Sequence, residues 1–139
     1  MNRIVLVVED QLEDQLLISR AVKSVCSEVT VVMTETGGDA LDYIYRRGPY
    51  DSRELSENPS LVIADHVLPD MFACDLVRRV REFVEANSLP VFVYATKIDG
   101  TAYKYWDLSI DGPLKRPDDP AEFQHAVMDA VRRHLQIVN

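Results

Sequence analysis

Residues 4–25 read IVLVVEDQLEDQLLISRAVKSV, and this stretch decides the fold class. Residues 4–8 form a continuous run of β-branched residues and leucine, which is typical of a strand buried on both faces of a parallel sheet. The segment that follows carries apolar side chains at helical spacing, namely Leu12, Leu16, Leu17, Ala21, Val22 and Val25. This spacing predicts an amphipathic helix over 11–25, so the chain opens with a strand followed by a helix.

The same alternation continues along the chain. Apolar runs predict further strands and helical spacing predicts further helices, at residues 29–33 (strand), 39–45 (helix), 61–64 (strand), 91–94 (strand) and 121–135 (helix). A helix after Asp65 is expected to bury one side, formed by Leu76, Val77, Val80, Phe83 and Val84. Turn residues interrupt the stretch 96–115, where we expect a short helix and a short fifth strand. The polar residues 46–60 predict a surface loop.

Five strands that alternate with helices predict an α/β fold. We expect a flavodoxin-like, doubly wound parallel sheet with strand order 2-1-3-4-5 and helices on both faces. The length of 139 residues is that of one typical domain, so residues 1–139 are expected to form a single one. In such a sheet, ligands bind beyond the carboxyl ends of the strands.

Composition excludes several classes of partner. The formal net charge of -8 opposes binding to nucleic acid or to an anionic membrane surface. The apolar run at the N-terminus is too short for a signal peptide or a membrane span. Cys26 and Cys74 show no metal-ligand spacing, and a pair of cysteines in a chain without a secretion signal indicates buried thiols in a reducing cytoplasm.

Acidic residues follow two strands that are neighbours in the expected order. Glu9 and Asp10 close the first strand, and Asp65 closes the third. A single acidic residue at such a place is often only a helix N-cap, and Asp10 fits that role. Three converging carboxylates repel one another, and Mg²⁺ relieves this repulsion while leaving room for phosphate oxygens. The pattern favours phosphoryl transfer to Asp65, with Glu9, Asp10 and the backbone carbonyl of Val67 as further metal ligands.

These residues resemble the receiver domain of response regulators in two-component phosphorelay systems. The resemblance covers nearly the whole chain and rests on VLVVED, TGGDAL, LVIADHVLPDM, LPVFVYAT and LKRPDDPAEF. It implies a phosphoprotein that forms an aspartyl phosphate on Asp65, with a sensor histidine kinase or a phosphotransfer protein as donor. The loop RRGPYDSRELSENPSLV further resembles single-domain regulators that partner phytochrome-type sensor kinases.

The chain departs from the family pattern at two places. Receivers carry Thr or Ser at the end of the fourth strand, where this chain has Ala95, with Thr96 one residue later. They also carry Lys before the proline that follows the fifth strand, where this chain has Arg116, preceded by Lys115. A shift of one residue reverses the facing of a side chain, so Arg116 is the better candidate for contacting phosphate oxygens.

Three aromatic residues cluster in the segment that is expected to form the short helix, namely Tyr103, Tyr105 and Trp106. In the resembled family this helix, the fifth strand and the last helix form a face that changes on phosphorylation and often makes a homodimer, and aromatic residues are favoured interface anchors. The alternative is that one or two of them cap the core. His66 is expected at the rim of the site, and Arg78, Arg79 and Arg81 on a solvated helix face.

The leading hypothesis is a stand-alone receiver without an effector domain, because the chain ends four residues after Leu135. It would signal to a downstream protein target by contact, and it would be no enzyme beyond its own phosphorylation and dephosphorylation. The second hypothesis is a degenerate receiver that binds proteins or dimerises without phosphorylation, which Ala95 and Arg116 motivate. A haloacid-dehalogenase-like hydrolase is disfavoured because Val67 stands where a second Asp is usual.

Overall fold

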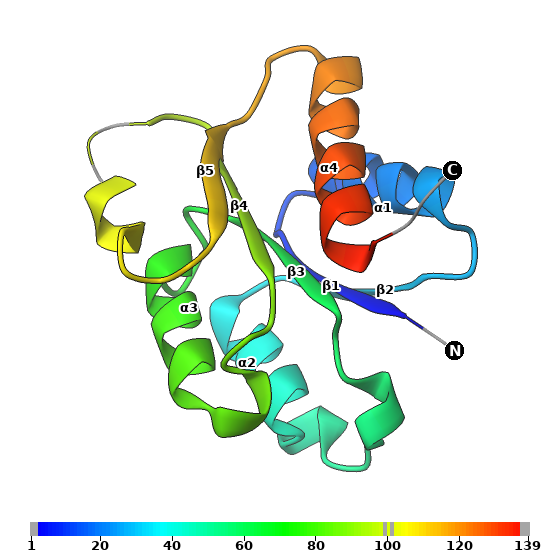
Figure 1. Ribbon diagram of the computed structural model, residues 1–139, viewed down its shortest axis with the longest axis vertical. Coiled ribbons are helices and arrows are strands. Elements are labelled where there is room, and N and C mark those ends of the chain that lie inside the picture. Colours follow the sequence, from blue (N-terminus) through cyan, green and yellow to red (C-terminus); the bar gives the residue numbers. More distant parts are fainter. Residues whose placement is uncertain (1–2, 99, 101, 137–139) are drawn as a thin grey trace.

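The core of the fold is a sheet of five parallel strands. The computed structural model describes residues 3–98, 100 and 102–136. The strands pair in the order β2-β1-β3-β4-β5 (Figure 1). They are β1 (Ile4–Val8), β2 (Thr30–Thr34), β3 (Leu61–Asp65), β4 (Val91–Ala95) and β5 (Asp111–Lys115). The predicted flavodoxin-like order is therefore confirmed.

Four helices cover the sheet, two on each face (Figure 1). The first face packs against α2 (Gly37–Tyr45) and α3 (Ala73–Glu82), and the second against α1 (Leu12–Val25) and α4 (Pro120–Leu135). Every residue of β1 and β4 is buried, as the continuous apolar runs predict for strands covered on both sides. Successive side chains of each strand alternate between the two faces.

Local hydrogen bonds fix where the helices begin. The side chain of Thr36 accepts a hydrogen bond from the backbone N–H of Asp39 at the start of α2. Asp39 lies in the first turn, where a negative charge is favourable. At the start of α4, Asp119 accepts from the N–H of Ala121, and Pro120 occupies the first turn. Sequence therefore locates both helix starts to within two residues.

The structure corrects the sequence prediction in three segments. The short helix expected within 96–115 is a single 3-10 turn, Ala102–Tyr105, which precedes β5. The helix α3 ends at Glu82, so Val84 falls in a separate turn and its side chain is 82% exposed rather than buried. On α1, Leu12 and Leu16 are exposed, although helical spacing placed them with the inward side chains.

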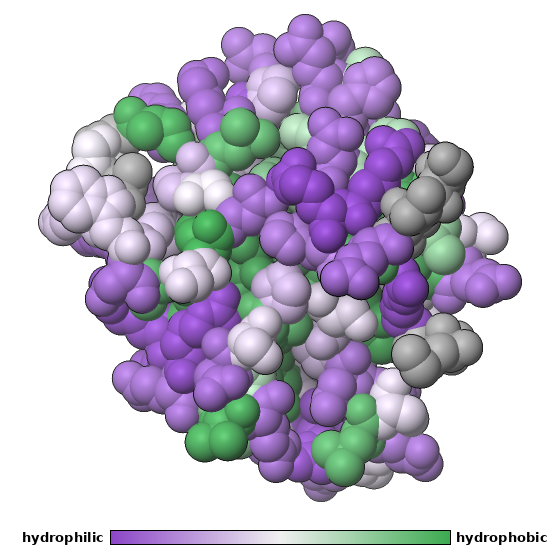
Figure 2. All heavy atoms as spheres, viewed as in Figure 1, coloured by the Kyte–Doolittle hydropathy of each residue, from purple (hydrophilic) through white to green (hydrophobic). Residues whose placement is uncertain are grey.

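The loop 46–60 is ordered by one arginine. It contains two 3-10 turns, and Arg53 donates hydrogen bonds to the backbone carbonyls of Tyr43, Ile44 and Glu54. Its guanidinium also lies over the ring of Tyr43, 4.6 Å from the centroid. Hydrophilic side chains cover most of the face in Figure 2, and the hydrophobic patches on it are small and separate. None of the helices within the described ranges is long and apolar enough to cross a membrane.

Candidate functional site

Three polar side chains meet at the carboxyl edge of the sheet. Asp65 ends β3 and stands in register with Tyr94 of β4, so both side chains point to the face covered by α1 and α4. Glu9 directly follows β1 and is fully buried. The Tyr94 hydroxyl donates a hydrogen bond of 2.5 Å to Glu9 Oε1, and the N–H of Gln11 donates one of 2.8 Å to Oε2. Glu9 is thus held in one orientation by its neighbours.

Burial disfavours the ionised form of both carboxyl groups. It raises the pKa of Glu9 from 4.5 to about 7, against the hydrogen bonds from Tyr94 and Gln11, and the charge of Asp65 adds to the rise. Burial also raises the pKa of Asp65 from 3.8 to about 6, against hydrogen bonds from the Val67 N–H and the Glu9 side chain. Glu9 and Asp65 are therefore close enough to compete for one proton near neutral pH.

A fourth acidic residue, Asp14, belongs to the site and was missed by sequence analysis. Its negative charge raises the pKa of both Glu9 and Asp65. Its Oδ1 lies 2.5 Å from the guanidinium of Arg116, and both side chains are about one-fifth exposed. Asp14 lies in the first turn of α1, whereas Asp10 precedes the extended N-cap residue Gln11 and lies outside the helix. An acidic residue in a first turn is favourable on its own account, so the sequence carried no separate signal that Asp14 joins the site.

Asp10 and Val67 lie at the rim of the site. Asp10 is exposed and contributes through its charge to the raised pKa of Asp65. The N–H of Val67 lies 3.5 Å from Asp65 Oδ1. Across the ranges that the structure describes, no three His, Cys, Asp or Glu side chains are arranged to hold a metal ion. The structure thus brings Glu9 and Asp65 together, with the exposed Asp10 at the rim, close enough for its charge to act on Asp65.

The chemistry of this donor set fits a hard divalent cation. Glu9 and Asp65 offer carboxylate oxygens, which Mg²⁺ prefers together with water. Burial is the main reason that both pKa values are raised. The charge of Asp14 adds to the rise for both groups, so a cation at this place would relieve an existing repulsion. Asp10 and the Val67 carbonyl stand at the same edge of the sheet and add two further oxygens.

The residues expected to contact phosphate separate into two pairs. Ala95 is the last residue of β4 and is buried, and its register partner Lys115 is exposed. Thr96 and Arg116 line a pocket of about 300 Å³ together with Gln11, Glu13, Asp14 and Asp118. Arg116 lies over the ring of Phe123, 4.4 Å from the centroid. Its Nε is buried and has no hydrogen-bond partner among the described residues.

Tyr105 is a core residue, which corrects its assignment to an interface. It is 4% exposed, and its hydroxyl lies 2.6 Å from Nδ1 of His66. His66 is also buried and stacks on Phe72, so it is not a rim residue. Tyr103 and Trp106 do lie on the surface, where their rings form an edge-to-face pair with centroids 6.4 Å apart. The expected surface cluster is therefore reduced to these two rings.

Two arginines of α3 donate hydrogen bonds to backbone carbonyls and are not only solvated. Arg81 donates hydrogen bonds to the carbonyls of Leu89, Leu108 and Ser109. Arg78 donates to the carbonyl of Lys104. The expectation of a purely solvated face is therefore wrong for these residues, because they tie the segment before β5 to α3.

Curated proteins of similar sequence are two-component response regulators. The two-component response regulator ARR17 of Arabidopsis thaliana is 30% identical over 121 residues, which cover 82% of this chain and 78% of that protein. The two-component response regulator ORR3 of Oryza sativa subsp. indica is 31% identical over 93 residues, covering 67% of this chain. The match spans 63% of the rice protein, less than two thirds of its length. No protein-family model matches the chain.

Solved structures with the same fold include receivers. The phosphorylated cyanobacterial phytochrome response regulator RcpA superposes with a TM-score of 0.88 and 20% identity, over 100% of this chain and 98% of that one. The Mn²⁺-bound form of response regulator Rcp1 superposes with a TM-score of 0.85 and 18% identity, over 99% and 97%. At these identities the likeness establishes the fold.

Proposed function

This chain belongs to the two-component response regulators, and from that membership we propose that it accepts a phosphoryl group on Asp65. Receivers of this family are signalling domains rather than classical enzymes. The observation that carries the proposal is the position of Asp65 at the carboxyl end of the central strand β3, next to the buried carboxyl of Glu9. Ligands of open parallel sheets bind at this edge.

The proposed reaction is a phosphoryl transfer to a carboxylate. An oxygen of ionised Asp65 attacks the phosphorus of the donor, an O–P bond forms, and the bond between phosphorus and the donor breaks with its electron pair staying on the donor. Because burial raises the pKa of Asp65 to about 6, the nucleophilic form is favoured above that pH. Tyr94 and Gln11 hold Glu9 beside it.

We propose that Asp65, Glu9, Asp10 and the Val67 carbonyl hold Mg²⁺ when phosphoryl transfer occurs. A bound divalent cation supplies charge neutralisation for the phosphoryl oxygens. The Mn²⁺-bound form of Rcp1 supports a divalent cation in this fold. The protein residues would hold their oxygens in fixed positions around the cation. Glu9 is fixed in this way by the hydrogen bonds that it accepts from Tyr94 and Gln11.

Arg116 and Thr96 are the proposed contacts of the phosphoryl oxygens. Both line the pocket next to the site. Arg116 pairs with Asp14, so contact with a phosphoryl group requires its guanidinium to exchange one anion for another. The hydroxyl of Thr96 offers a donor that Ala95 lacks.

We propose a sensor histidine kinase or a phosphotransfer protein as the donor. RcpA is a phytochrome response regulator, which makes a phytochrome-type kinase a specific candidate. The output would pass by contact to a downstream protein or a second copy of the chain. The exposed rings of Tyr103 and Trp106, next to β5, are the proposed contact surface.

A second candidate function is a degenerate receiver that binds proteins without being phosphorylated. The observation that favours it is the ion pair between Arg116 and Asp14, which engages the guanidinium that would contact phosphate, together with the absence of a hydroxyl on Ala95. In this case the fold would serve as a binding or dimerisation module.

The deciding experiment is intact-protein mass spectrometry after incubation with acetyl phosphate and Mg²⁺. Wild type is expected to gain one phosphoryl mass, and Asp65→Asn is expected to gain none. A wild-type sample that is folded and binds Mg²⁺ but gains no mass would favour the degenerate module. A gain in both proteins would place the acceptor at another residue.

A further inference from the structure

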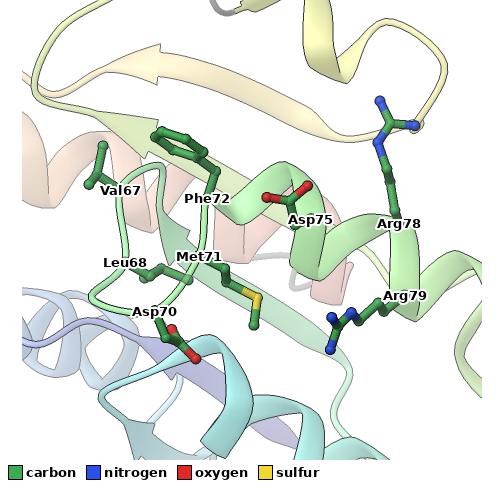
Figure 3. Close-up of a pocket in the computed structure, with 8 residues that line it drawn as sticks. All are labelled: Val67, Leu68, Asp70, Met71, Phe72, Asp75, Arg78 and Arg79. Carbon is green, nitrogen blue, oxygen red and sulfur yellow. The ribbon is translucent and has the colours of Figure 1, made fainter.

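The loop that follows Asp65 is fastened to α2 by one carboxylate. Asp70 Oδ1 accepts a hydrogen bond of 2.9 Å from the N–H of Gly37, and Oδ2 accepts one of 2.9 Å from the N–H of Gly38. These are the first two residues of α2, whose backbone N–H groups have no partner within the helix. Figure 3 shows Asp70 at the end of the loop, next to this helix. A negative charge at a helix N-terminus is also favoured by the helix dipole.

A close contact beside Asp70 makes the fastening more specific. A Cβ atom on Gly37 would lie 2.4 Å from Sδ of Met71 and 2.6 Å from its Cγ. Any larger residue at position 37 would require the Met71 side chain to shift. Asp70, through its hydrogen bonds, and Met71, through its packing, therefore both hold the loop against the first turn of α2.

The loop 66–72 is short and has hydrogen bonds within it. The position of Asp70 therefore determines where Val67 lies. The N–H of Leu68 donates to the carbonyl of Met71 at 3.0 Å, and Val67 forms an antiparallel bridge with Phe72. Val67 in turn brings its N–H to 3.5 Å from Asp65 Oδ1. Only two residues, Leu68 and Pro69, lie between Val67 and Asp70.

We propose that Asp70 is a positioning residue for the metal and phosphoryl site, acting through the loop 66–72 to hold the Val67 backbone beside Asp65. This inference rests on the proposed function, because it takes the backbone carbonyl of Val67 to be a metal ligand. Substituting a residue that orients a metal ligand without touching the metal often lowers the metal affinity by an order of magnitude. Asp75 lines the same pocket as Asp70 and is exposed, so it supplies a matched control of equal charge.

The test is a calorimetric titration of the full chain with Mn²⁺, alongside urea unfolding of each variant. Asp70→Asn is expected to weaken Mn²⁺ binding about tenfold, while Asp75→Asn changes it less than about twofold because only a distant charge is lost. Gly37→Ala leaves all charges unchanged and displaces Met71, so it is expected to weaken Mn²⁺ binding as well. Each titration is made at a temperature where urea unfolding shows the variant to be folded.

The outcomes separate this inference from the proposed function. Asp70→Asn and Gly37→Ala proteins that unfold more easily but bind Mn²⁺ as wild type does would reduce Asp70 to a structural residue and overturn the inference alone. Equal weakening in Asp70→Asn and Asp75→Asn would reduce it to a general charge effect and also overturn it. A wild type that binds no Mn²⁺ would overturn the proposed metal site and this inference together.

Discussion

Replacing Asp65 by Asn is expected to make the metal-free protein more stable at alkaline pH. Asp65 is ionised at pH 8 in both the folded and the unfolded chain, but in the folded chain its charge is partly buried next to Glu9. Asn has the same shape and no charge, so the substitution removes this unfavourable burial. The residue proposed to carry the reaction would thus lower the stability of the fold that presents it.

The magnitude follows from the raised pKa. The pKa of Asp65 rises from 3.8 to about 6, and at about 1.4 kcal/mol for each unit, ionisation at pH 8 destabilises the folded state by at most about 3 kcal/mol. Asp65 is only partly buried, and solvent screening reduces the expected gain for Asp65→Asn to about 1–2 kcal/mol. Because the folded chain binds the proton more tightly than the unfolded chain, this penalty grows as the pH rises from about 4 through about 6.

Urea unfolding in the presence of a chelator measures this difference. Asp65→Asn is expected to unfold at higher urea than wild type at pH 8, and the difference is expected to shrink as the pH falls towards 4. Mg²⁺ should narrow the difference at pH 8, because it stabilises only the protein that binds it. Asp51→Asn, an exposed loop position, controls for the reduced net charge. Equal stability at pH 8 without metal, or equal dependence on pH, would refute the reasoning.

Three further substitutions test contacts around the site by urea unfolding. Tyr94→Phe removes the hydrogen bond to a buried carboxylate and is expected to destabilise by about 2 kcal/mol at pH 8 and by less at pH 5; a loss independent of pH would contradict the assignment. Tyr105→Phe is expected to destabilise by about 1–2 kcal/mol, whereas Trp106→Phe stays within about 0.5 kcal/mol. Arg81→Met is expected to destabilise by about 2 kcal/mol because three carbonyls lose a charged donor, and Arg79→Met serves as its exposed control.

Sequence periodicity predicts the inner strands of the sheet well because β1, β3 and β4 are covered on both faces, whereas the edge strand β5 is largely exposed and has no apolar run. A strand buried on both faces must be apolar at every position, so continuous runs such as residues 4–8 and 61–64 identify it without knowledge of its neighbours. The acidic residues Glu9 and Asp65 then follow from where these runs end. Helix starts are similarly readable, because Thr36 and Asp119 carry their capping groups in the local sequence.

The parts of the site that were missed depend on contacts between distant segments. Arg116 and Asp14 are 102 residues apart, and no local pattern links them. Tyr105 turns inward to meet the hydrophobic core and His66, which is 39 residues away in the sequence, and the three neighbouring aromatic residues do not reveal this contact. From the sequence, Arg81 is indistinguishable from the neighbouring surface arginines. Only the folded structure places the carbonyls of Leu89 and Leu108 beside it. Such pairings become visible only when the elements are assembled.

Trp106 gives the protein an optical reporter of its own. It is the single tryptophan of the chain, and at 86% exposure its indole stands almost entirely in water next to β5. Excitation at the red edge of the absorption band therefore addresses one residue, and quenching by acrylamide reads its accessibility directly. A partner or a second copy that covers this surface would shift the emission to shorter wavelength and protect it from the quencher, with no label attached.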